Sequence, residues 1–222
     1  MNDVTVSGMV LQAMQIGEYD LRVVILTRER GKISAFAKGA RRQGNPLGAY
    51  CRPFAFGEFT LYEGRTAYTV RNARIKNYFE ELQADLLGVY YGFYFLEFAS
   101  FYTRENNDEF VVLKLLYYAL LALQKESLDH DLVQAVYELK LMMMNGDYPG
   151  KPPKGVREAT AYTMDFVLQT PVEKLFTFTL KPEIHQEFIG CVEELKEHYL
   201  HHEFSSMTVL EDMKCLIHDT IS

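Results

Sequence analysis

The chain has 222 residues, of which 48% are apolar and 24% are charged, as is typical of a folded globular protein rather than a disordered one. This length predicts one or two domains. With 14 Gly and 7 Pro, the composition excludes a collagen-like or low-complexity chain. No apolar run is long enough to cross a bilayer, and the first residues do not form a secretory signal, so we expect no membrane partner.

The three cysteines, Cys51, Cys191 and Cys215, are far apart and form no CxxC pair. An odd number at such spacing excludes a disulfide scaffold and a cysteine-rich zinc site. It fits the reducing environment of the cytoplasm, where we expect the protein to act.

Charge is unevenly distributed along the chain. The formal net charge is −7, yet residues 1–80 carry 12 Lys and Arg against 7 Asp and Glu. Residues 81–222 carry 11 Lys and Arg against 23 Asp and Glu. A basic first part with an acidic remainder indicates a polyanionic partner for the first part alone.

The first part has the pattern of short strands. Runs rich in apolar and β-branched residues predict strands at 4–11, 21–27, 33–37 and 54–62, and residues 66–70 lead into a fifth. Gly31 lies in the turn after the second strand and can supply a positive φ there. Five short strands within about 75 residues predict a small closed barrel of the OB type.

The rest of the chain has a helical pattern. We predict helices at 86–101, 110–123, 131–144 and 156–168, and a last long helix that begins at Pro182 and ends at Tyr199 or Leu200. Asp129 is the expected N-cap of the third of these helices, and residues 148–155 are expected to form an exposed loop. The predicted fold is therefore α+β, with a five-stranded barrel at 1–80 and an all-helical domain at 81–222.

Basic residues lie where a barrel would present its loops. Arg22 is on the second strand, and glycines next to several cations would let the backbone approach a phosphate chain. Tyr50, Tyr62 and Tyr68 lie among these cations and are expected to be partly exposed, whereas phenylalanines 54, 56 and 59 are expected in the core. The candidate DNA-binding residues are Arg28, Lys32, Lys38, Arg41, Arg42, Arg65, Arg71 and Arg74.

Motifs of common enzyme classes are absent from the sequence, which contains no GxxxxGK[ST], GxGxxG, GxSxG or HExxH. We therefore expect no catalytic residues, no cofactor and no enzyme activity. One possible metal site remains open, since Glu194, His198 and His202 are spaced to share one helix face. The ordinary interpretation of that cluster is a solvated helix end.

Several segments resemble the bacterial DNA-repair family RecO. The N-terminal resemblance lies in Gly17 to Asp20, Leu26 to Lys32 and Ala37 to Arg42; further along the chain it lies in Tyr137 to Leu141, Gly146 to Pro149, Pro171 to Phe178 and His198 to Leu210. Members of this family combine an OB-type barrel with a helical C-terminal domain, in agreement with the pattern of the residues.

The resemblance implies a function. RecO-like proteins bind single- and double-stranded DNA, anneal complementary strands coated by single-strand binding protein (SSB), and load RecA together with RecR. It implies phosphate contacts for Arg28, Lys32, Lys38, Arg41 and Arg42, and action at the bacterial nucleoid. The acidic SSB tail would dock on the helical domain, whose available cations include Lys114, Lys140, Lys151, Lys154 and Arg157.

In one respect the sequence departs from the family. Many RecO proteins carry a four-cysteine zinc motif after the segment that matches Gly146 to Pro149, but residues 150–180 contain no cysteine. We therefore expect a zinc-free form, in which packing replaces the metal. The alternative function is a non-catalytic module whose barrel binds a peptide or an acidic protein instead of DNA; steeply salt-dependent DNA binding separates the two.

Overall fold

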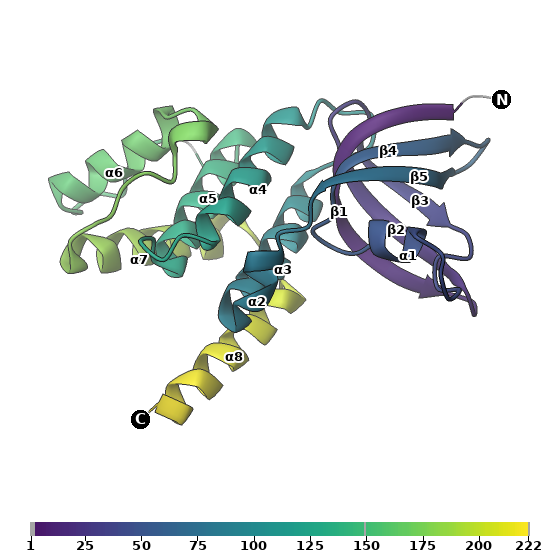
Figure 1. Ribbon diagram of the computed structural model, residues 1–222. Helices are drawn as coiled ribbons and strands as arrows, with labels where there is room; N and C mark the ends of the chain where they lie inside the picture. The colour runs from purple at the N-terminus through teal and green to yellow at the C-terminus, as the bar shows by residue number, and fades with distance from the viewer. Residues whose placement is uncertain (1–2, 149, 222) are drawn as a thin grey trace. The chain divides into compact units, whose positions relative to one another are not determined.

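The computed structural model describes residues 3–148 and 150–221, with the side chains of 218–221 excepted. Met1, Asn2, Pro149 and Ser222, which fall within predicted ranges, lie outside the described residues. The chain separates into two compact units (Figure 1). One consists of Met1–Glu80 and Ala99–Leu113, and the other of Glu81–Phe98 and Lys114–Ser222.

The first unit is a closed five-stranded barrel. Its strands are β1 (Asp3–Ile16), β2 (Asp20–Thr27), β3 (Gly31–Ala37), β4 (Phe56–Glu63) and β5 (Tyr68–Asn77), and they follow one another around the barrel in the order β1-β2-β3-β5-β4. All neighbours are antiparallel except β3 and β5. This confirms the predicted OB-type barrel.

β1 is longer than predicted because it serves two neighbours. Its first half pairs with β4 and its second half pairs with β2, with a bulge between Val10 and Gln12. The barrel is filled by alternate residues of each strand, among them Val10, Ile25, Ala35 and Phe59. The intervening positions therefore face outward.

Two local predictions for the barrel were wrong. β4 begins at Phe56 rather than Phe54, because Phe54 has a φ of 71°, which does not belong to a strand. Tyr68, expected to be partly exposed, is buried in the barrel core because it occupies an inward position of β5. Between β3 and β4 the chain also forms a short helix, α1 (Leu47–Tyr50).

The second unit is helical. α3 (Leu86–Tyr102) and α4 (Phe110–Leu123) lie mainly in it, although residues 99–102 and 110–113 belong to the barrel unit. The other helices are α2 (Glu80–Ala84), α5 (His130–Met144), α6 (Glu158–Gln169), a 3-10 turn at Val172–Lys174, α7 (Pro182–Tyr199) and α8 (Ser205–Ile221). The all-helical prediction is confirmed.

The helix ends confirm one prediction made from the sequence and correct two others. The Asp129 carboxylate accepts a hydrogen bond of 3.0 Å from the Leu132 N–H, which confirms the predicted N-cap of α5. α7 ends at Tyr199, so His202 is not on this helix and cannot share a helix face with His198. The helix beginning at Pro182 is not the last one, because α8 follows it.

Candidate nucleic-acid interface

One row of outward-facing residues crosses four strands of the barrel. Arg22 on β2 lies opposite Phe36 on β3, Phe36 is level with Thr69 on β5, and Thr69 lies opposite Tyr62 on β4. Arg22 and Phe36 are exposed, and Thr69 and Tyr62 are half-buried. We call these four residues the outer row; it presents a cation and two aromatic rings on the barrel surface.

Two arginine side chains are held in place on this row. The Arg22 Nε donates a hydrogen bond of 2.8 Å to the Ser34 Oγ on the neighbouring strand, which fixes the direction of the guanidinium. Arg71 on β5 lies over the Tyr62 ring, 5.1 Å from its centroid. Both guanidinium groups remain at the surface, where they can meet a phosphate.

A second cluster follows the end of β3. The Arg41 backbone N–H donates to the Tyr19 carbonyl and its guanidinium donates to the Glu18 carbonyl, each at 2.9 Å. Arg42 lies over the exposed Tyr19 ring, 5.3 Å from its centroid. The loop after β3 is thereby joined to the β1–β2 turn, and exposed Lys38 stands at its start. We call Tyr19, Lys38, Arg41 and Arg42 the loop cluster.

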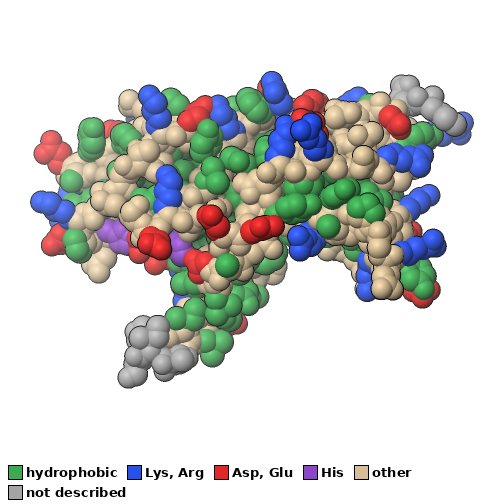
Figure 2. All heavy atoms as spheres, viewed as in Figure 1, with side chains coloured by type: hydrophobic (Ala, Val, Ile, Leu, Met, Phe, Trp, Pro, Cys, Tyr) green, Lys and Arg blue, Asp and Glu red, His purple; other side chains and the backbone are tan. Residues whose placement is uncertain are grey.

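A groove of about 440 Å³ opens beside the outer row. Arg22, Ser34 and Phe36 form one side and the β4–β5 turn with Arg65 forms another. Glu63 also lines the groove; its carboxylate receives a 3.4 Å hydrogen bond from the Tyr68 hydroxyl and lies 3.7 Å from an Arg30 nitrogen. Over the barrel, Figure 2 shows several further Lys and Arg side chains at the surface.

The structure thus brings together most of the predicted binding residues. Arg65 lines the groove, Arg71 lies over the Tyr62 ring of the outer row, and Lys38, Arg41 and Arg42 belong to the loop cluster. Arg74 is exposed on β5 but lies opposite Glu58, which also pairs with Lys76. The hydrogen bond from Lys76, its charge and the charge of Arg74 lower the pKa of Glu58.

Lys32 and Arg28 instead contact residues 99–113. The Lys32 Nζ donates to the Ser100 backbone carbonyl, and its pKa is lowered by burial and by the charge of Arg104, with Glu109 acting in the opposite sense. Arg28 lies over the Phe110 ring, 4.7 Å from its centroid. Lys32 and the exposed Arg28 thus join the β2–β3 region to residues 99–113 within the barrel unit.

Sequence reasoning did not single out Phe36 or Tyr19 as surface residues. Phe36 occurs in a run of apolar and small residues. The only sign that it faces outward is that it alternates along the strand with Ile33, Ala35 and Ala37, which are buried. Tyr19 lies in a turn, where an aromatic side chain is a signal for exposure that can be read from sequence.

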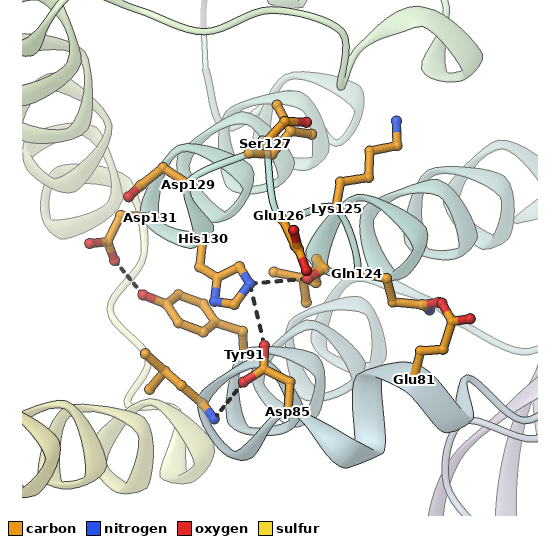
Figure 3. Close-up of a pocket in the computed structure, with 13 residues that line it drawn as sticks. Glu81, Asp85, Tyr91, Gln124, Lys125, Glu126, Ser127, Asp129, His130 and Asp131 are labelled. Carbon is orange, nitrogen blue, oxygen red and sulfur yellow. Dashed lines mark hydrogen bonds and ion pairs between the residues drawn. The ribbon is translucent and has the colours of Figure 1, made fainter.

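The helical unit contains a pocket of about 750 Å³ with a different character (Figure 3). Its carboxylates are largely engaged: the Tyr91 hydroxyl donates to Asp131 at 2.5 Å, and the His130 Nε2 lies 3.6 Å from an Asp85 oxygen. Burial, followed by the hydrogen bond to Asp131, raises the pKa of Tyr91. An acid-rich pocket of this kind does not suit a phosphate chain.

Donors for a structural zinc are not assembled in the residues that the structure describes. Cys51 and Cys191 are buried and Cys215 is exposed, and within 3–148 and 150–217 no three His, Cys, Asp or Glu side chains form a metal-binding group. Burial raises the pKa of the Cys51 thiol to about 12, which opposes the thiolate that zinc requires. The residues present do not fit the zinc site found in many related proteins.

Among the cations of the helical unit, Lys140 is not at the surface. It is buried, and its Nζ donates to the backbone carbonyls of Val167, Leu168 and Thr170. Lys114 pairs with Glu173 and Arg157 pairs with Glu187, whereas Lys151 and Lys154 are exposed. Of the helices in the described part of the chain, none is both long enough and apolar enough to cross a bilayer.

Comparison with known proteins supports both units. The family model described as "Recombination protein O N terminal" matches residues 1–79, and the one described as "Recombination protein O C terminal" matches residues 83–150. The two matches occur in the expected order. The first covers the barrel strands and the second covers α3, α4 and α5.

Curated relatives carry the same family name. The "DNA repair protein RecO" of Alkaliphilus metalliredigens is 37% identical over 142 residues, which is 64% of this chain and 58% of that protein. The one from Acetivibrio thermocellus is 30% identical over 149 residues, 67% of this chain and 59% of that protein. The one from Clostridium kluyveri is 22% identical over 206 residues, 92% of this chain and 74% of that protein. The chain thus spans somewhat less than two thirds of the length of the first two relatives. With a matching barrel, a matching helical region and relatives of one name, the chain belongs to the RecO family.

Proposed function

We propose that this protein acts in DNA repair and recombination without breaking covalent bonds. In this proposal the barrel binds single- and double-stranded DNA, anneals complementary strands that carry SSB, and helps to load RecA together with RecR. The observation that carries the proposal is the arrangement of exposed cations and aromatic rings on the barrel of a RecO-family chain.

The loop cluster and the outer row supply complementary kinds of contact. Arg and Lys side chains neutralise phosphates and release counterions, and exposed aromatic rings stack on unpaired bases. Lys38, Arg41 and Arg42 are exposed at the end of β3, and Phe36 lies within two residues of this end. A DNA strand bound along β3 would meet the Phe36 ring and the Lys38 cation within about 7 Å, at about 3.3 Å per residue of β-strand.

Annealing follows from charge neutralisation. Two DNA strands repel each other through their phosphates, and salt at physiological concentration screens charges only beyond about 8 Å. Cations held on a rigid barrel reduce this repulsion at close range, so base pairing can proceed. The helical unit has many more acidic than basic residues, and we assign it the docking of SSB and RecR rather than contact with DNA.

The test uses one triple variant and one charge-matched control. Lys38→Ala with Arg41→Ala and Arg42→Ala removes three cations of the loop cluster. Lys125→Ala with Lys174→Ala and Lys181→Ala removes three exposed cations of the helical unit. Affinity for a labelled single strand is measured by fluorescence anisotropy between about 50 and 200 mM salt, the range over which phosphate contacts weaken strongly.

We expect the loop-cluster variant to bind DNA more weakly and to lose about 2 from the slope of log K against log salt, at about 0.7 per phosphate contact. The control variant should retain both the affinity and the slope. Annealing of SSB-coated complementary oligonucleotides, with and without RecR, should fall in parallel with binding. Wild-type protein that fails to bind DNA, or a loop-cluster variant with unchanged slope, contradicts the proposal.

A further inference from the structure

We propose that the groove beside the outer row is a pocket for one unstacked nucleotide, so that this part of the barrel prefers single-stranded DNA to duplex. The inference rests on the proposed DNA binding and adds to it a position and a strand preference. Base-paired DNA cannot occupy such a pocket without first flipping a nucleotide out of the stack.

The size of the groove suits a single nucleotide. Its volume of about 440 Å³ lies toward the lower end of the range for small-ligand sites, about 300–1,000 Å³. Three separate segments enclose it: the outward residues of β2 and β3, the β4–β5 turn, and residues 105–106. A pocket bounded on several sides limits its occupant to one base with its sugar, rather than a stacked run.

Phe36 gives the pocket a stacking surface. Its side chain is 37% exposed on the outer face of β3, although it is flanked by the fully buried Ala35 and Ala37. A large ring held at the surface of a rigid strand is the platform on which single-strand binders stack a base. The neighbouring Arg22 guanidinium, fixed by Ser34, lies where it can bind the adjoining phosphate.

The charges of the groove orient the nucleotide. Arg22 on β2 and Arg65 in the β4–β5 turn both line the groove, and both are exposed. Glu63 is held within the groove by Tyr68 and Arg30. Glu105 is a second carboxylate of the lining and is exposed, and the third arginine, Arg30, is paired with Glu63. A phosphate is attracted to the two exposed arginines and repelled by the two carboxylates, so the base, which is uncharged, enters the groove. Glu63 and Asn106 then offer hydrogen-bonding atoms to the base edge.

The experiment compares two substitutions of Phe36. Phe36→Leu removes the ring but keeps an apolar side chain at a surface position, so the barrel core is not disturbed. Phe36→Tyr keeps the ring. Tyr162→Leu is the matched control, since it removes an aromatic ring that is 70% exposed in the helical unit. Affinities are measured at one salt concentration for a 20-nucleotide single strand and for the blunt duplex of the same sequence.

We expect Phe36→Leu to weaken single-strand binding by at least about 5-fold, in line with the loss of one base stacked on a ring, and to change duplex binding by less than about 2-fold. Phe36→Tyr and Tyr162→Leu should bind both DNA forms as the wild type does. Equal weakening of both forms, or no effect of Phe36→Leu, overturns the pocket while leaving the proposed function intact. Wild-type protein that binds neither form overturns the proposed function itself.

Discussion

The Glu97 carboxylate on α3 accepts a hydrogen bond of 2.8 Å from the backbone N–H of Ser206, in the first turn of α8. The Ser206 hydroxyl and the N–H and hydroxyl of Ser205 donate to the same carboxylate. The N-terminus of α8 is thus capped by a residue more than 100 positions earlier in the chain. Further along α8, the Lys214 Nζ donates to Asp131 on α5 at 2.6 Å.

Removal of the Glu97 carboxylate should loosen α8. Glu97→Ala leaves the first N–H groups of the helix without their acceptor, and the loss of a helix cap costs about 1–2 kcal/mol. We expect faster hydrogen exchange in residues 205–217, measured by mass spectrometry, with little change in the barrel strands. Glu211→Ala, which removes another exposed carboxylate from α8, is the control. If residues 205–217 exchange at the same rate in Glu97→Ala as in Glu211→Ala, then Glu97 does not hold α8.

Acid should release α8 in the wild type. For Glu97, burial acts to raise the pKa, but the hydrogen bonds from Ser206 and Ser205 outweigh it and the pKa lies below the ordinary 4.5. For Asp131, burial is likewise outweighed by Lys214 and Tyr91, and the pKa lies below 3.8. Carboxylates with depressed pKa values stabilise the folded state above their ordinary pKa values.

This stabilisation is lost as the pH falls through the lowered values. We therefore expect the protection factors of the α8 amides, in which the exchange rates are corrected for the intrinsic effect of pH, to be high at pH 6 and to fall below about pH 4, the range set by ordinary carboxyl pKa values. In Glu97→Gln the change with pH should be smaller, because one of the two titrating groups is gone. A wild type whose α8 protection does not depend on pH down to the onset of global unfolding would contradict this account.

Lys140 should be required for the stability of the helical unit. Its ammonium group caps three backbone carbonyls at the end of α6, and Lys140→Met fills the space but leaves these acceptors unpaired in the interior. We expect a loss of about 2 kcal/mol or more in the free energy of unfolding, measured by urea denaturation. Lys174→Met, at an exposed position, should be close to neutral. Equal stability of the two variants would refute a capping role for Lys140.

Gly31 should be required for the packing of residues 99–113 on the barrel. It has a φ of 65°, and a Cβ atom there would lie 2.2 Å from the Arg104 carbonyl oxygen. Gly17 has a similar φ of 61° but nothing within 4 Å of the corresponding position. Gly17→Ala therefore measures the backbone strain alone, about 1–2 kcal/mol for one residue. Gly31→Ala should lower the free energy of unfolding by clearly more than this. Equal losses of thermal stability in the two variants would mean that the Arg104 backbone can move away from the new Cβ at no cost in free energy.

Two lysines, one near the start of β3 and one just after its end, should separate stability from DNA binding. Lys32 is half-buried against Ser100, whereas Lys38 is exposed in the loop cluster. We expect Lys32→Met to lower the melting temperature with little effect on the salt slope of DNA binding. Lys38→Met should do the reverse, with a slope reduced by about 0.7 for one phosphate contact. Both effects in one variant would show that the division between these two residues is wrong.

Local sequence patterns predicted the elements of this fold well. Alternation in 33–37 predicted the strand that the structure shows as β3, and Asp129 marked the start of α5, because each signal involves only neighbouring residues. The errors have a different origin. Phe54 adopts a positive φ, and α8 depends on Glu97 from a distant helix. Neither property can be read from the residues nearby.

The sequence by itself determined the barrel-then-helices order, the basic character of the first part and the RecO resemblance, since composition and period are properties of short stretches of chain. Only the tertiary structure decided which cations act together. The pairing of β2, β3, β5 and β4 aligns Arg22, Phe36, Thr69 and Tyr62 in one row, and the loop after β3 brings Arg42 onto Tyr19. The tertiary structure also makes Lys32 and Lys140 hydrogen-bond donors to backbone carbonyls. The physical reason is that a lysine or arginine is a binding group only if its charge remains in solvent, and burial is set by contacts between residues far apart in the chain.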